Sequence, residues 1–78
     1  MKETEFLQFI IENLVNKTED IRIEQTEDEL GILLTLSVAK DDMGMIIGKG
    51  GNTINAIRSI LRLHGMKQDK RLNLKVLD

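Results

Sequence analysis

The residues best suited to chemistry stand together as Gly48-Lys49-Gly50-Gly51, which form a glycine loop (residues 48–51). Without Cβ atoms at Gly48 and Gly51, a sugar-phosphate chain can lie directly on the backbone. The N–H groups and the dipole at the start of a following helix favour a phosphate oxygen, and Lys49 adds a mobile positive charge. The alternative is that the glycines only make a tight turn between two helices.

Two common nucleotide-binding motifs do not fit this loop. A Walker loop requires a glycine where Met43 stands and a serine or threonine where Gly50 stands. A dinucleotide fingerprint that begins at Gly48 requires its third glycine where Thr53 stands, and it must follow a strand directly. A loop that joins two helical segments fits better.

A basic track continues from the loop into the next helix. Arg58 and Arg62 are four residues apart, so they lie on one side of a helix. The charge of the whole chain changes sign at the loop: residues 1–47 carry a net charge of −7 and residues 48–78 carry +5, which together give −2. This asymmetry predicts an electropositive side that attracts a polyanion. Alternatively, both regions are ordinary solvated surfaces.

Other ionisable residues give little support to catalysis or metal binding. The chain has no cysteine, and His64 has no evident carboxylate partner. Asp41 and Asp42 are adjacent and point in different directions on a forming helix, so we expect them to cap it. The acidic residues 27–29 are expected in a solvated turn. We therefore expect no enzyme, metal or cofactor.

The apolar periodicity predicts three helical segments and three strands that belong to one small domain. Two adjacent strands joined by a short turn predict an antiparallel hairpin. The order α-β-β-α-α-β predicts an α+β fold, in which helices cover one face of a three-stranded sheet. In chain order, we expect a helix over residues 3–16 with Phe6, Ile10 and Leu14 on one face, a short strand at Ile21 and Ile23, a turn at residues 26–29, a strand over residues 31–39, a short helix at residues 43–47, a helix over residues 52–64 ended by Gly65, and a strand over Leu72, Leu74 and Val76.

Two features that the sequence lacks, a membrane-spanning run and a signal-peptide pattern, indicate where the protein is located. No apolar run approaches the roughly 20 residues that span a bilayer, so no membrane role is expected. The acidic start of the chain has no signal-peptide pattern, and the lack of cysteine suits a reducing compartment. We expect a cytoplasmic protein.

The loop and its surroundings resemble the KH domain. The sequence Ile46-Ile47-Gly48-Lys49-Gly50-Gly51 between two helices, preceded and followed by a strand, is the signature of that family. A helix and strand placed before this core resemble its type II arrangement. The runs at residues 39–44 and 56–58 narrow the resemblance to the KhpA family of small bacterial single-KH proteins. The resemblance covers essentially the full chain, residues 1–78.

The resemblance implies how single-stranded RNA would bind. A KH loop clamps the backbone of about four nucleotides, a role that falls on residues 48–51. Ile46, Ile47 and the neighbouring strand would line an apolar groove for bases. The chain has Asn52 and Asn55 where the family often carries basic residues, which would weaken the phosphate track. The RNA-contacting residues implied are Ile46, Ile47, Gly48, Lys49, Gly50, Gly51, Asn52, Asn55, Arg58 and Arg62.

The only aromatic residues are Phe6 and Phe9, for which we expect core packing. The chain therefore has no platform for stacking bases of the kind used by RRM and OB domains. A KH groove lined by aliphatic residues needs none.

A second surface is predicted on the helix over residues 52–64. Its apolar arc is wider than one core-facing stripe requires, because Ala56, Ile60 and Leu63 extend it beyond the core positions. These residues either pack under the closing strand or form a dimer interface. The resemblance favours the second: KhpA-like proteins form homodimers and pair with KhpB, a larger Jag-like KH protein.

The resemblance implies a non-catalytic RNA chaperone or post-transcriptional regulator, linked in some bacteria to cell elongation and division. A protein-interaction module that keeps the KH shape, with incidental RNA binding, is the alternative. A small nucleotide-binding protein is a more distant one.

Overall fold

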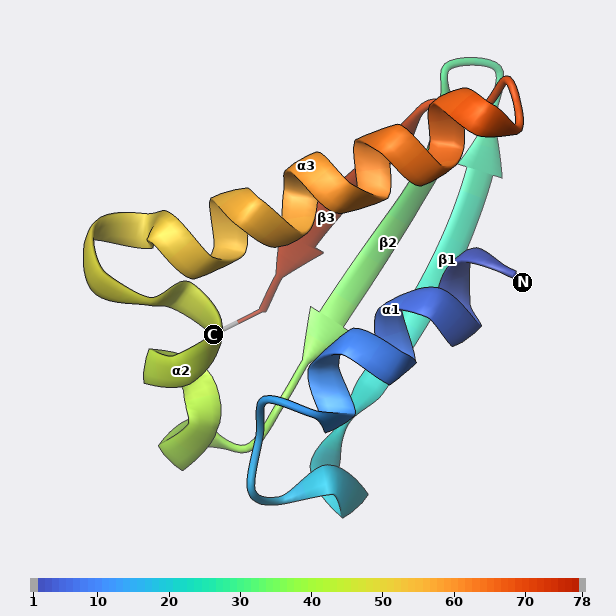
Figure 1. The fold of residues 1–78 in the computed structure, drawn as a ribbon. Helices are drawn as coiled ribbons and strands as arrows, with labels where there is room; N and C mark the ends of the chain where they lie inside the picture. The colour runs from blue at the N-terminus through green and yellow to red at the C-terminus, as the bar shows by residue number, and fades with distance from the viewer. Residues whose placement is uncertain (1, 78) are drawn as a thin grey trace.

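The computed structural model describes residues 2–77 and has two layers, with helices α1 and α3 lying across one face of a sheet (Figure 1). This confirms the predicted α+β fold and the order of its elements. Three 3₁₀ turns, at Thr18–Asp20, Lys40–Asp42 and Lys49–Gly51, link the main elements. Those elements are α1 (Glu3–Glu12), β1 (Arg22–Asp28), β2 (Gly31–Ser37), α2 (Met43–Ile47), α3 (Asn52–Lys67) and β3 (Leu72–Val76).

The sheet has the order β1-β2-β3, so β2 is its central strand. Strand β1 pairs with β2 in antiparallel fashion, as the hairpin prediction requires. Strand β3 pairs with β2 in parallel, with Ile32 opposite Leu72. The alternating residues Ile32, Leu34 and Leu36 of β2 are buried against the helices. The central strand therefore forms the floor of the core.

The hairpin turn lies further along the chain than predicted. Residues 26–28 continue strand β1, and the turn is made by Glu29 and Leu30. The Asp28 carboxylate accepts the Leu30 backbone N–H at 2.8 Å, and Gly31 adopts a φ of 136°. The acidic run was wrongly assigned to a turn because charged residues are tolerated on an edge strand whose outer side faces water.

Helix α1 is shorter than predicted and presents a different face to the core. It ends at Glu12, and the fully buried residues are Leu7 and Ile11. Leu14, which the pattern placed on one face with Phe6 and Ile10, lies beyond the end of the helix and is 38% exposed. Phe9 is 58% exposed, so its predicted core role was wrong.

The start of α1 is held against the end of α3. Phe6 stacks on His64 with 4.7 Å between ring centroids, and the buried Glu3 carboxylate pairs with the Lys70 ammonium at 3.6 Å. A hydrogen bond to its own backbone N–H, followed by the charge of Lys70, holds the pKa of Glu3 below its usual 4.5, against the opposing effect of burial. Both contacts fix α1 to the α3–β3 junction.

Helix α3 continues past Gly65 to Lys67, contrary to the prediction that Gly65 ends it. The chain turns at Asp69, whose φ is 58°. The Lys70 N–H donates to the Gly65 carbonyl at 2.7 Å and the Asp69 N–H to the Met66 carbonyl at 3.1 Å, a pattern of helix C-termini known as the Schellman motif. A glycine is required at position 65 because the chain folds back against it. A Cβ there would lie 2.5 Å from the Lys70 carbonyl oxygen.

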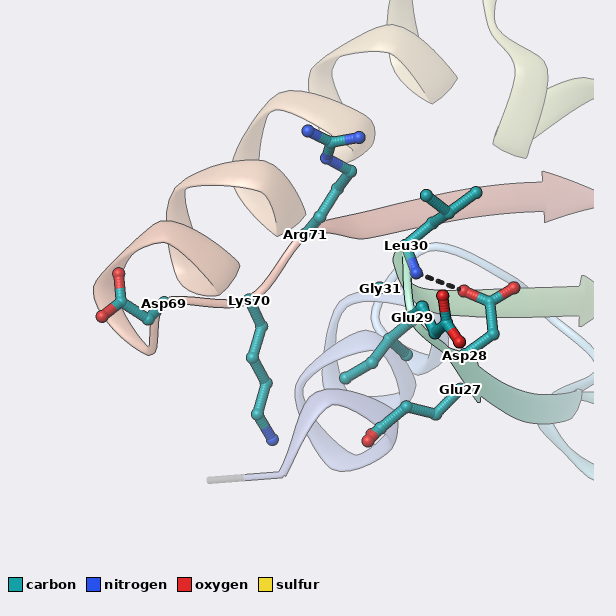
Figure 2. A pocket seen from close by; sticks show the side chains of 9 residues that line it. Glu27, Asp28, Glu29, Leu30, Gly31, Asp69, Lys70 and Arg71 are labelled. Atoms are coloured by element: carbon teal, nitrogen blue, oxygen red, sulfur yellow. Dashed lines mark hydrogen bonds between the residues drawn. The ribbon is translucent and has the colours of Figure 1, made fainter.

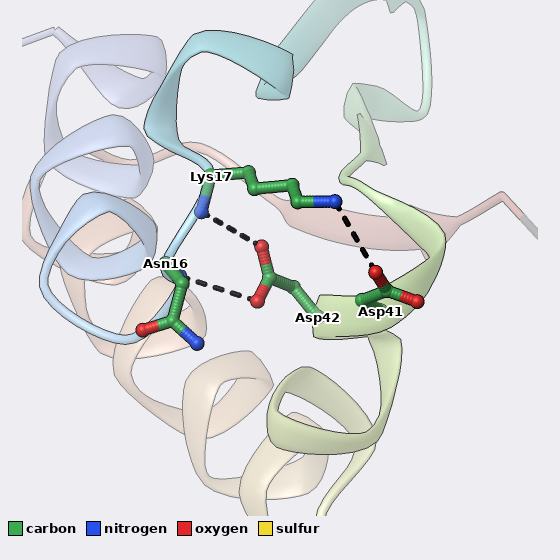
Figure 3. Close-up of polar contacts among 4 residues, drawn as sticks. All are labelled: Asn16, Lys17, Asp41 and Asp42. Carbon is green, nitrogen blue, oxygen red and sulfur yellow. Dashed lines mark hydrogen bonds and ion pairs between the residues drawn. The ribbon is translucent and has the colours of Figure 1, made fainter.

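The two aspartates before α2 have separate roles, and neither side chain caps a helix, although Asp42 occupies the N-cap position of α2. The carboxylate of Asp42 is buried and accepts the backbone N–H groups of Asn16 and Lys17 at 3.2 and 3.0 Å (Figure 3). Asp41 is exposed and pairs with the Lys17 ammonium at 3.2 Å. Asp42 therefore fastens the start of α2 to the loop after α1, and so helps to place the glycine loop.

Gly65→Ala is expected to lower the free energy of unfolding by about 1–3 kcal/mol, because the added methyl group overpacks the contact with Lys70. Gly44→Ala is the matched control. A Cβ at Gly44 meets nothing within 4 Å and the residue is helical, so this change should raise stability by about 0.5–1 kcal/mol. Urea unfolding followed by circular dichroism measures both. Equal effects of the two substitutions would contradict the close packing at Gly65.

Asp42→Ala is expected to destabilise the protein by about 2–4 kcal/mol, because two backbone N–H groups lose a charged acceptor. Asp41→Ala removes only an exposed ion pair and should change stability by less than about 1 kcal/mol. The same urea titration compares the neighbours. A similar loss from both would show that the buried carboxylate is not the fastening.

Candidate functional site

The glycine loop forms the turn between α2 and α3, and its three glycines all adopt positive φ. The values are 76° at Gly48, 64° at Gly50 and 81° at Gly51. This region of backbone conformation is open to glycine and strained for most side chains. Gly51 is the N-cap of α3, and no side chain caps the first N–H groups of that helix. The loop therefore leaves backbone donors without a side-chain partner beside the exposed Lys49.

The space around each glycine differs. A Cβ at Gly48 would lie 2.7 Å from Cβ of Thr53, so this glycine makes room for the start of α3 itself. A Cβ at Gly50 would meet nothing within 4 Å, and one at Gly51 would meet only the Asn55 side-chain nitrogen at 3.7 Å. The open side of the loop is thus at Gly50 and Gly51, and the reason for Gly48 is internal packing.

The two isoleucines before the loop lie in different environments. Ile46 is fully buried in the core, which does not fit the expectation that it lines a groove for bases. Ile47 is 37% exposed and remains available at the surface. Ile46 therefore supports α2 from within, while Ile47 offers the apolar surface next to Gly48.

Two arginines of α3, Arg58 and Arg62, lie beside strand β3. Arg58 is half-buried, with its Nε 3.4 Å from the Leu74 carbonyl oxygen and its Nη1 3.4 Å from the Asn55 side-chain oxygen. Asn52, Asn55 and Arg62 are exposed. These contacts bring the predicted track of Arg58 and Arg62 to the α3–β3 edge.

A groove runs between α3 and β3. It is lined by Arg58, Leu61, Arg62, Leu72, Asn73 and Leu74. Bases were expected against a strand beside the loop, but the sequence identified no individual residue of β3 at the site. The pairing of β3 with β2 determines which side of α3 the strand β3 lies against. That pairing cannot be inferred from the apolar alternation within β3 alone.

The residues of the predicted second surface are exposed. Ala56 lies on the surface, Ile60 is 43% exposed and Leu63 is 65% exposed. They point away from the core residues Ile57 and Leu61 of the same helix. The alternative that they pack under the closing strand is therefore wrong, and the apolar strip formed by Ala56, Ile60 and Leu63 is part of the molecular surface.

Two further findings concern the described part of the chain. Within residues 2–77, no group of three or more histidine, cysteine, aspartate or glutamate residues could hold a metal ion. None of the helices in that range is both long and apolar enough to cross a membrane.

Comparisons with known proteins agree on one family. The family model for the KhpA/KhpB KH domain matches residues 4–76. The RNA-binding protein KhpA of Chlamydia pneumoniae is 43% identical over 74 residues, which cover 95% of this chain and 95% of the relative. The KhpA proteins of Borreliella burgdorferi and Listeria monocytogenes are each 36% identical, over 97% and 95% of this chain and 93% and 97% of their own. With its α-β-β-α-α-β order and its glycine loop between α2 and α3, the chain belongs to the KhpA/KhpB family of KH domains.

Proposed function

We propose that the chain is a single KH domain, without catalytic activity, that binds single-stranded RNA on the glycine loop. The observation that carries this proposal is the open backbone at Gly50 and Gly51 beside the exposed Lys49. The names of the relatives, RNA-binding protein KhpA, support RNA as the partner. RNA as partner also suits the cytoplasmic location expected from the sequence.

The geometry suggests a division of labour at the site. Phosphate oxygens would accept hydrogen bonds from the loop and from the first turn of α3, where no side chain competes for the N–H groups. Lys49 would add charge without fixed direction. Bases would extend over Ile47 toward Asn55 and Arg58, whose amide and guanidinium groups can reach base edges. Phosphate contacts would thus position the strand and the α3–β3 groove would contact its bases.

One such site is small, so we expect weak and salt-sensitive binding. Each phosphate neutralised on a single strand contributes roughly −0.7 to the slope of log affinity against log salt. Asn52 and Asn55 provide no charge, which limits the number of phosphates held. By the family resemblance, the role of the protein would be RNA chaperoning or post-transcriptional regulation, linked in some relatives to cell elongation and division.

Lys49→Asp combined with Gly50→Asp is expected to weaken RNA binding at least about tenfold at low salt, because three units of negative charge are added where phosphates would lie. Aspartate is one of the few side chains that tolerates the φ of 64° at Gly50, and the space there is open. The fold should therefore be kept. Fluorescence anisotropy of a labelled single-stranded RNA pool, at low and moderate salt, measures the loss.

The matched control is Lys49→Asn with Gly50→Asn, which has similar shape and the same backbone tolerance without added negative charge. Its affinity should fall between those of the wild type and the aspartate variant. Equal binding by all three proteins, with unchanged circular dichroism, would mean that the glycine loop is only a turn.

A second candidate function, a protein-interaction module, is favoured by the apolar strip on α3. Ala56, Ile60 and Leu63 are four and three residues apart, so they are neighbours on one exposed side of the helix. A continuous apolar strip, unlike a single exposed apolar side chain, is typical of an interaction surface. A second copy of the chain, or a KhpB-like KH protein, would bury this strip. This surface faces away from Arg58 and Arg62 on the same helix, so the two functions are compatible: a dimer would offer two RNA sites and a higher effective affinity.

Leu63→Asp is expected to convert a dimer into a monomer of 8.9 kDa, because Leu63 is the most exposed large side chain of the strip and a carboxylate there would be desolvated in the interface. Leu30→Asp is the matched control, since Leu30 is similarly exposed but lies at the tip of the hairpin. Light scattering at micromolar protein reads the mass. A wild-type protein that is already a monomer at tens of micromolar would refute the interface.

A further inference from the structure

A second hollow lies at the far end of α3 from the glycine loop. This distal groove is lined by Arg62, Met66, Arg71, Leu72 and Asn73. It shares Arg62, Leu72 and Asn73 with the groove that contains Arg58. The two hollows are therefore continuous along the α3–β3 edge. At 1.5 Å per residue, Arg62 lies about 15 Å along the helix from Asn52 at the glycine loop.

The distal groove combines the groups that recognise a nucleotide. Leu72 is buried at its base, and Met66 is 67% exposed at its rim, so the groove offers apolar surface to one face of a base. Arg62 from α3 and Arg71 from the segment before β3 both line the groove and are exposed. Arginine can stack on a base or hold a phosphate with two hydrogen bonds. The exposed Asn73 amide offers a donor and an acceptor to a base edge.

The neighbouring charges limit where a phosphate could lie. Lys70 also borders the groove, but its ammonium pairs with Glu3, and in Figure 2 its side chain points away from that of Arg71. Asp69 is the carboxylate on the groove wall. Beyond Arg71, a shallow hollow is bounded by the hairpin carboxylates of Glu27, Asp28 and Glu29 (Figure 2). A polyanion that follows the arginines would be repelled there, so the track ends at Arg71.

We propose that the distal groove is a second nucleotide seat, which binds a nucleotide of the same single-stranded RNA that lies on the glycine loop. This proposal rests on the proposed function, because it requires the strand to pass the loop first. Arg71 holds the phosphate of the outer nucleotide, Met66 and Leu72 contact its base, and the acidic hairpin marks the end of the footprint. The footprint then exceeds the roughly four nucleotides that a KH loop clamps.

The test compares the binding of oligouridylates of four and eight nucleotides to four proteins, which are the wild type, Arg71→Gln, Lys67→Gln and the loop aspartate variant, by anisotropy at low salt. Arg71→Gln should leave the affinity for the four-nucleotide RNA unchanged and weaken that for the eight-nucleotide RNA by roughly three- to tenfold. Lys67→Gln removes the same charge from the same end of α3, but Lys67 does not line the groove. Lys67→Gln should leave the ratio of the affinities for the eight- and four-nucleotide RNAs as it is in the wild type. A longer RNA can bind the loop at more positions, but this statistical advantage is the same for every protein. It therefore does not affect the comparison between a variant and the wild type.

An independent readout is the Met66 side-chain methyl group in NMR spectra, because Met66 lines the distal groove but not the groove that contains Arg58. It should shift with the eight-nucleotide RNA and stay in place with the four-nucleotide RNA. Equal effects of Arg71→Gln on both lengths, or on neither, would overturn the second seat while leaving the loop proposal intact. A wild type that binds neither RNA, or a loop aspartate variant that binds both normally, would overturn the proposed function itself and this inference with it.

Discussion

The parallel pairing of β3 with β2 is the constraint on which the rest of the molecule depends. Parallel neighbours cannot be joined by a tight turn, so the chain must return from the end of β2 to its start before β3 begins. Helix α2 leaves the sheet, and α3 carries the chain back along it (Figure 1). The glycine loop is the reversal point of this crossover. The groove beside it exists because β3 must then lie next to α3.

The strand order also separates the charges of the molecule. The acidic strand β1 and the basic end of β3 lie at opposite edges of the sheet, with the apolar strand β2 between them. Two strand spacings amount to about 10 Å, close to the Debye length at 0.1 M salt. At that ionic strength the acidic edge therefore weakens the field on the α3–β3 side only modestly. The hairpin tip is the exception, because there Asp28 and Glu29 approach Arg71.

Most of the architecture could be predicted from sequence because local patterns determine it. The alternation in β2 and β3, the short helix α2 and the start of α3 after the glycines all follow from periodicity and turn chemistry. The glycine loop itself needs no tertiary information to be noticed. Arg58 and Arg62 were correctly placed on one flank of α3 by their spacing.

The features that were missed depend on contacts between distant segments. Two apolar rows run along α1, and only packing against the sheet and α3 selects Leu7 over Leu14. Gly65 looks like a helix end in sequence, but a glycine is needed there because the backbone at Lys70 packs against it. Asp42 looks like a cap, yet its carboxylate reaches backbone more than twenty residues away. The identity of the β3 residues that line the site has the same origin, since it depends on how β3 pairs with β2.

The close approach of Gly48 to Thr53 has a kinetic consequence. Because the start of α3 fills the space that a side chain at Gly48 would need, the loop conformation is set by the folded protein and does not await a ligand. The entropy of ordering this backbone is lost during folding rather than during association. The association rate constant of a ligand of the loop should therefore be set by diffusion and orientation, without a slow rearrangement of the loop. Differences in affinity between ligands would then appear mainly in how long each remains bound.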